Sequence, residues 1–87
     1  MAWKIEVSEK ATKNLEKLGA NAAKRIAKTM REVAALDDPR LRGEALTGNL
    51  AGFWRYRVGD WRIIVSFDDG RLVILVIEVG HRREVYR

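Results

Sequence analysis

Two segments rich in aromatic and β-branched residues, 54–58 and 61–67, flank the dipeptide Gly59-Asp60. A Gly-Asp pair in this position is typical of a two-residue β-hairpin turn. Such a turn fixes the register of the strands, so it places Arg57 directly opposite Arg62. The stretch FWRYRVGDWRII therefore predicts an antiparallel strand pair in which the turn decides which side chains share a face.

Alternation gives this hairpin one basic face and one apolar face. Arg55, Arg57 and Arg62 converge on one side of the strand pair. The opposite side carries Trp54, Tyr56, Trp61 and Ile63. Like charges directly across a strand pair are destabilising, whereas guanidinium groups match phosphate oxygens in bidentate geometry. We interpret the basic face as an anion site; the alternative is that the arginines extend into water, compensated by Asp60 or Glu78.

The first part of the chain has the pattern of one strand followed by two helices. Alternating apolar residues predict a short strand over 3–7. Ser8 can cap a helix that ends at Gly19, and Asn21 can cap a second helix that ends at Leu36. Because the link between them is short, the two helices are expected to form an αα-hairpin.

A second turn is predicted at Asp69-Gly70, between strands at 61–67 and 71–79. A two-residue turn there places Arg62 opposite Ile77 on the last strand. The nearly continuous apolar character of 71–79 indicates a central strand of the sheet.

The connection over 37–52 is polar and long for a compact domain, which favours a turn of helix or a functional role. Leu41, Leu46 and Leu50 are its expected anchors. The chain is predicted to be one α+β domain spanning 1–87, in the order β-α-α-β-β-β. An N-terminal strand and a two-helix hairpin precede a three-stranded antiparallel meander, and the helices pack on one face of the sheet.

The composition narrows the possible partners and chemistry. The 87 residues include 17 Lys and Arg against 12 Asp and Glu, and the formal net charge of +5 favours a polyanionic partner. The chain contains no cysteine, and a lone His81 is not a metal constellation, so we expect no metal ion or other cofactor. Neither a signal peptide nor a membrane span is predicted, so we expect a cytoplasmic protein with no membrane partner.

The segment after Gly80 adds further polar groups near the end of the basic face. His81, Arg82, Arg83 and Tyr86 are expected to reach the arginines there. Such a set can bind a nucleic-acid backbone and stabilise charge at a phosphorus attacked by a neighbouring 2′-hydroxyl. That reaction needs a base, an acid and cationic stabilisation, and the 2′-hydroxyl distinguishes RNA from DNA.

At these residues the sequence resembles the RelE-type toxins of the RelE/ParE superfamily. The resemblance is carried by LTGNLAGFWRYRVGDWRIIVSF and LVILVIEVGHRREVYR, and the element order extends it to nearly the whole chain. It implies a ribosome-dependent, metal-free endoribonuclease that cuts mRNA in the ribosomal A site. It also implies an acidic, RelB-like antitoxin as partner, with operator DNA bound only through the toxin–antitoxin complex.

The resemblance and the chemistry of the side chains together predict roles for individual residues. Arg55, Arg57, Arg62 and Arg83 are expected to bind RNA. Arg57, Arg62, His81, Arg82 and Tyr86 are expected to be catalytic, with Arg83 as an alternative alignment for Arg82. Well-known members have lysines where this chain has Arg55 and Arg57, and arginine cannot act as a base, so Tyr86 or His81 is expected to take that role.

Two other functions remain open at this point. One is a ParE-type inhibitor of DNA gyrase that has no nuclease activity. The other is a catalytically weak toxin that acts mainly as antitoxin partner and corepressor. Fold alone does not separate these functions.

Overall fold

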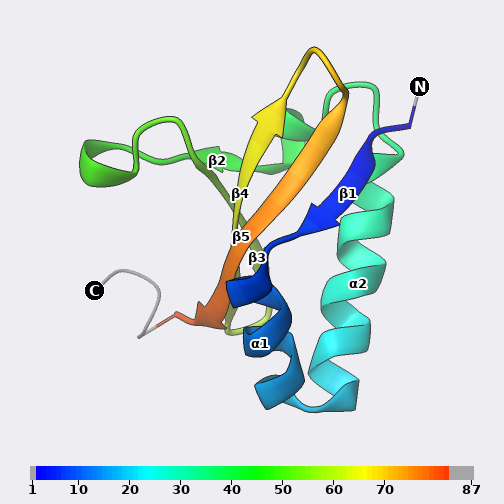
Figure 1. Ribbon diagram of the computed structural model, residues 1–87, viewed down its shortest axis with the longest axis vertical. Coiled ribbons are helices and arrows are strands. Elements are labelled where there is room, and N and C mark those ends of the chain that lie inside the picture. Colours follow the sequence, from blue (N-terminus) through cyan, green and yellow to red (C-terminus); the bar gives the residue numbers. More distant parts are fainter. Residues whose placement is uncertain (1, 83–87) are drawn as a thin grey trace.

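The computed structural model describes residues 2–82 and contains one five-stranded sheet with two helices packed on one face (Figure 1). The strand order is β1-β5-β4-β3-β2. This arrangement confirms the predicted α+β class, in which apolar helix stripes are buried against one side of a sheet. Among residues 2–82, no helix is long and apolar enough to cross a membrane.

The helical hairpin consists of α1 (Glu9–Leu18) and α2 (Ala20–Ala34). Ser8 caps α1 as predicted, because its side chain accepts a hydrogen bond from the Ala11 N–H. The predicted cap at Asn21 is wrong. Gly19 alone links the helices at φ 88°, a backbone conformation that favours glycine, so α2 begins at Ala20 and includes Asn21.

The first hairpin of the sheet has the predicted register. β3 (Trp54–Val58) and β4 (Trp61–Asp68) are antiparallel, with Arg57 opposite Arg62. Tyr56 and Ile63 of the apolar face are buried in one core with residues of α2, including Ile26. The other face of this strand pair is therefore turned away from the helices.

The predicted register of the second hairpin is wrong. The turn spans 69–72 rather than two residues, because Leu72 adopts φ 53° and Asp68 pairs with Val73. An irregularity at Ile64/Val65 shifts the register further. As a result, Arg62 lies opposite Gly80 of β5 (Val73–His81) rather than Ile77.

The outer strands complete the sheet. β1 (Lys4–Val7) pairs in parallel with β5, which makes β5 a central strand, as predicted. At the other edge lies β2 (Glu44–Ala45), which pairs with β3 and was not predicted.

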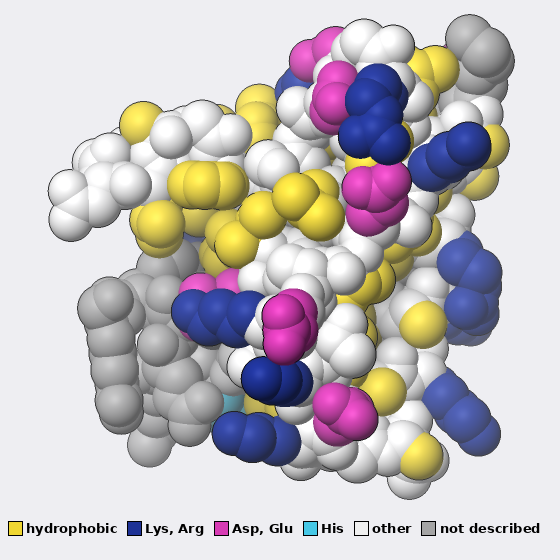
Figure 2. Space-filling view, in the orientation of Figure 1, with side chains coloured by type: hydrophobic (Ala, Val, Ile, Leu, Met, Phe, Trp, Pro, Cys, Tyr) yellow, Lys and Arg dark blue, Asp and Glu magenta, His cyan; other side chains and the backbone are white. Residues whose placement is uncertain are grey.

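The long connection contains two 3₁₀ turns, η1 (Pro39–Arg42) and η2 (Gly48–Leu50), and the segment around η2 projects from the body of the molecule (Figures 1 and 2). Leu41 is 82% exposed and does not anchor the connection, contrary to prediction. Pro39, which is buried, and Arg40 anchor the connection instead. The Arg40 guanidinium lies 4.4 Å from the Phe67 ring centroid and binds both carboxylate oxygens of Asp69 at 3.0 and 2.7 Å.

Candidate functional site

The hairpin β3–β4 carries Arg55, Arg57 and Arg62 on the face opposite the helices, and we call these three residues the arginine face. Arg57 and Arg62 are directly paired across the strands, and Arg55 is opposite Ile64. The Arg57 side chain is 55% exposed, whereas that of Arg55 is only 14% exposed. The three guanidinium groups therefore share a face but differ in their access to a ligand.

Arg62 is held by the hairpin turn. Its Nη1 donates hydrogen bonds to the carbonyl oxygens of Gly59 at 2.9 Å and Trp61 at 3.0 Å. On the neighbouring strand its partner is Gly80, which has no side chain. Arg62 is thus fixed at the turn.

Glu44 is a member of this site that the sequence did not reveal. One oxygen of its carboxylate contacts Nη2 of Arg55, and the other lies 3.7 Å from Nη2 of Arg57. Glu44 belongs to a strand of only two residues, which is too short to produce a periodic pattern. The unusual length of the connection was the one signal that pointed toward it.

His81 and Arg82 lie at the end of the sheet nearest the hairpin turn. His81 pairs with Trp61, and their rings meet edge to face at 5.7 Å. Directly opposed residues project from the same face, so His81 lies on the face opposite Arg62. The Arg82 N–H donates to the Asp60 carbonyl oxygen at 2.9 Å, which brings that residue's backbone to the turn.

The remaining predicted site residues, Arg83 and Tyr86, lie outside the described residues. Their assignments stay predictions. The arginine face itself is brought together by the hairpin register, and the fold adds Glu44 from β2.

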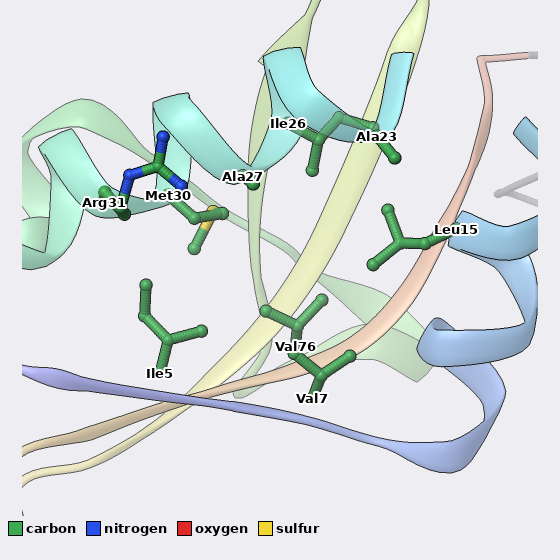
Figure 3. A pocket seen from close by; sticks show the side chains of 9 residues that line it. All are labelled: Ile5, Val7, Leu15, Ala23, Ile26, Ala27, Met30, Arg31 and Val76. Atoms are coloured by element: carbon green, nitrogen blue, oxygen red, sulfur yellow. The ribbon is translucent and has the colours of Figure 1, made fainter. Parts of the chain in front are cut away.

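A second surface lies where β1 faces the helical hairpin. It is an apolar groove of about 240 Å³ (Figure 3). Its apolar lining consists of Ile5, Val7, Leu15, Ala23, Ile26, Ala27, Met30 and Val76. Val7 is 44% exposed there, and Arg31 lies at the margin. Lys and Arg side chains also line the outer side of α2 (Figure 2).

Comparison with known proteins places this geometry in a family. Residues 5–86 match the family described as the ParE toxin of the type II toxin–antitoxin system parDE. The chain is 32% identical to "mRNA interferase toxin RelE" of Escherichia coli K12, across 99% of this chain and 92% of that protein.

Solved structures agree with the sequence comparison. The toxin in the RelBE2 complex of Mycobacterium tuberculosis superposes with a TM-score of 0.85 at 21% identity, covering 97% of this chain and 95% of that one. A double mutant of E. coli RelE in the free state superposes with a TM-score of 0.80 at 25% identity. The match covers 98% of this chain and 88% of that one. The chain therefore belongs to the RelE/ParE superfamily as a RelE-type toxin of a type II toxin–antitoxin system.

Proposed function

We propose that this toxin is a metal-independent endoribonuclease that cuts mRNA in the ribosomal A site. The observation that carries the proposal is the direct pairing of Arg57 with Arg62 on a sheet face that the helices leave uncovered. Two adjacent guanidinium groups attract a phosphate and remain charged at any working pH. The naming of the E. coli relative as an mRNA interferase supports the same activity.

The proposed reaction is an internal transfer at phosphorus. The 2′-hydroxyl oxygen forms a bond to the adjacent phosphorus, and the bond from phosphorus to the 5′-oxygen breaks, leaving a 2′,3′-cyclic phosphate. Negative charge develops on the phosphoryl oxygens, and Arg57 and Arg62 stabilise it. One proton leaves the 2′-hydroxyl and one proton reaches the departing 5′-oxygen, so the reaction needs a base and an acid.

Glu44 is the proton acceptor that the geometry favours. Arginine does not give up its proton in proteins, so the arginines supply charge only. The Glu44 carboxylate lies beside Arg55 and Arg57, whereas the His81 ring lies against Trp61 on the other face. Of the two bases expected from the sequence, His81 lies on the other face, and Tyr86 is proposed as the proton donor.

The composition of the site supports the proposed ribosome dependence. A face built mainly of cations attracts RNA but does not hold the 2′-oxygen in line with the leaving group. The ribosome, in the cytoplasm, would supply an mRNA held in a defined conformation. The isolated toxin should therefore cut free RNA slowly.

The partner that regulates this activity is an acidic antitoxin, and operator DNA is bound only through the complex of the two. The apolar groove at β1 and α2 supports this proposal, because it is open and bordered by basic side chains. An acidic segment that folds on binding gains both apolar burial and charge pairs there. Solved relatives include RelE–RelB complexes from E. coli and from Pyrococcus horikoshii.

Primer extension on an mRNA translated in vitro tests the proposed activity. Purified toxin should produce stops within codons when ribosomes are present and few stops on the same RNA without ribosomes. The family description also names ParE, which favours gyrase inhibition as the second candidate. A gyrase supercoiling assay with the same protein separates the two: inhibition without any RNA stops would replace the nuclease proposal.

A further inference from the structure

The carboxylate of Glu44 lies between two arginines of the face proposed to bind RNA. One oxygen contacts Arg55, and the other faces Arg57 at 3.7 Å. A carboxylate and a phosphate accept hydrogen bonds from the same guanidinium groups, so they compete for them. This side chain therefore has a bearing on RNA binding that is separate from proton transfer.

The fold holds Glu44 in this place. β2 aligns Glu44 directly opposite Arg55 on β3. The preceding Gly43 packs against Tyr56 so closely that a Cβ there would lie 3.2 Å from its ring. The Tyr56 hydroxyl in turn donates to the Pro39 carbonyl oxygen at 2.6 Å, and this hydrogen bond ties down the start of the same segment.

The two arginines differ in how firmly they are held. The Arg55 side chain is largely buried and in contact with the carboxylate, whereas Arg57 is 55% exposed and beyond hydrogen-bond distance. An exposed, loosely matched ion pair contributes little stability, so it exchanges readily for a better acceptor. Arg57 is free to change partner at little cost, and Arg55 is not.

We infer that Glu44 occupies the position of an RNA phosphate in the free toxin and gives up Arg57, but not Arg55, when RNA binds. This inference rests on the proposed RNA-binding function and makes Glu44 a residue that limits affinity. The carboxylate lowers general attraction for polyanions, so only a phosphate placed between Arg57 and Arg62 competes well. Glu44 thereby favours a correctly positioned backbone over RNA bound at random.

The test uses a fluorescein-labelled, 2′-O-methylated single-stranded oligoribonucleotide, which cannot be cleaved. Fluorescence anisotropy gives its affinity for the full-length toxin between about 50 and about 200 mM salt. Glu44→Gln should tighten binding about two- to fivefold. It should also steepen the plot of log affinity against log salt by about 0.7, the value for one further phosphate contact on a single strand.

Glu32→Gln is the matched control. Glu32 has similar exposure, 50% against 57% for Glu44, and pairs with Arg42 at 3.9 Å, away from the arginine face. Both variants change the net charge equally. Equal effects of the two substitutions on affinity and on the salt dependence would overturn the inference.

A second measurement needs no variant. In an NMR titration of the parent toxin with inorganic phosphate, the side-chain Nε–H signal of Arg57 should move and that of Arg55 should not. Equal movement of both signals would also overturn the inference. Both experiments measure binding only. A negative primer-extension result would therefore contradict the nuclease proposal without deciding whether Glu44 competes with phosphate for Arg57.

Discussion

Arg57 and Arg62 face each other across the hairpin, but the protein uses them differently. Arg62 donates two hydrogen bonds to backbone carbonyls at the turn, whereas among residues 2–82 Arg57 makes only a loose contact with Glu44. Arg62→Ala should therefore lower the free energy of unfolding by about 0.5 to 1.5 kcal/mol. Arg57→Ala should leave it unchanged or raise it by up to about 1 kcal/mol, because it relieves like-charge repulsion.

Urea unfolding of both variants checks this difference. The sequence alone suggests that either substitution is stabilising, because it reveals only the opposed charges. Equal stability of the two variants would mean that the turn hydrogen bonds of Arg62 contribute nothing measurable.

The buried phenol of Tyr56 should make the free energy of unfolding fall at alkaline pH. Burial raises the pKa of the Tyr56 phenol to about 12, against the opposing effects of Arg40 and Arg42. The folded state therefore keeps the proton more tightly than the unfolded state, whose phenol has a pKa near 10. This contribution is complete below pH about 10 and is lost as pH rises toward about 12, a loss of about 2 to 3 kcal/mol.

Tyr56→Phe isolates that contribution. It should cost about 1 to 3 kcal/mol at neutral pH, because it leaves the Pro39 carbonyl without its hydrogen bond. It should also flatten the alkaline loss relative to the parent in unfolding measured at several pH values. Parallel curves for the two proteins would contradict the assignment of the raised pKa to Tyr56.

At the residue scale, the sequence predicted the pairing of Arg57 with Arg62 because a two-residue turn leaves a single register. It did not predict Glu44, because that side chain reaches the site through packing. Gly43 against Tyr56 and the Tyr56–Pro39 hydrogen bond involve residues far apart in the chain. No local pattern encodes such contacts.

At the scale of elements, Arg40 fastens η1, and through it β2, to the end of the sheet. Its guanidinium lies over Phe67 and pairs with Asp69, and this pair holds the pKa of the Asp69 carboxyl below its usual range. Arg40→Ala should cost about 1 kcal/mol and loosen the connection. Hydrogen exchange should then speed up at the Leu46 N–H, which donates to the Phe53 carbonyl at 3.0 Å.

Arg42→Ala is the control for that experiment, because Arg42 also lies on η1 but pairs loosely with Glu32. It should leave exchange at Leu46 unchanged. Equal acceleration in both variants would show that the connection is held by other contacts.

The second hairpin shows the limit of turn signals in the sequence. Asp69-Gly70 has the composition of a two-residue turn, yet the chain uses four residues, with Leu72 in the left-handed region. Leu72 is partly buried and packs against the core, a contact that the local turn signal does not encode. The four-residue turn and the irregularity at Ile64/Val65 together place Arg62 opposite Gly80 rather than the predicted Ile77.

At the scale of the whole molecule, the apolar groove and the arginine face belong to different parts of the sheet. The groove lies between β1 and the helices, whereas the arginines lie on the face of β3 and β4 opposite the helices. Ala27→Glu should weaken antitoxin binding at least about tenfold by placing a charge in the groove, with ribosome-dependent cleavage preserved. Calorimetry with the purified antitoxin measures the first effect.

Ala20→Glu provides the same change on the exposed first residue of α2, outside the groove. It should bind the antitoxin as the parent does. An Ala27→Glu variant with unchanged affinity would show that the antitoxin does not use this groove.

The most direct test of the account compares Arg57→Ala with Arg71→Ala by primer extension in a translating extract. Both remove one exposed arginine, but Arg71 lies at the β4–β5 turn and pairs with Glu6, away from the arginine face. Arg57→Ala should lower ribosome-dependent cleavage at least about a hundredfold, and Arg71→Ala should cleave like the parent. Full cleavage by a folded Arg57→Ala variant would contradict the assignment of catalysis to the arginine face.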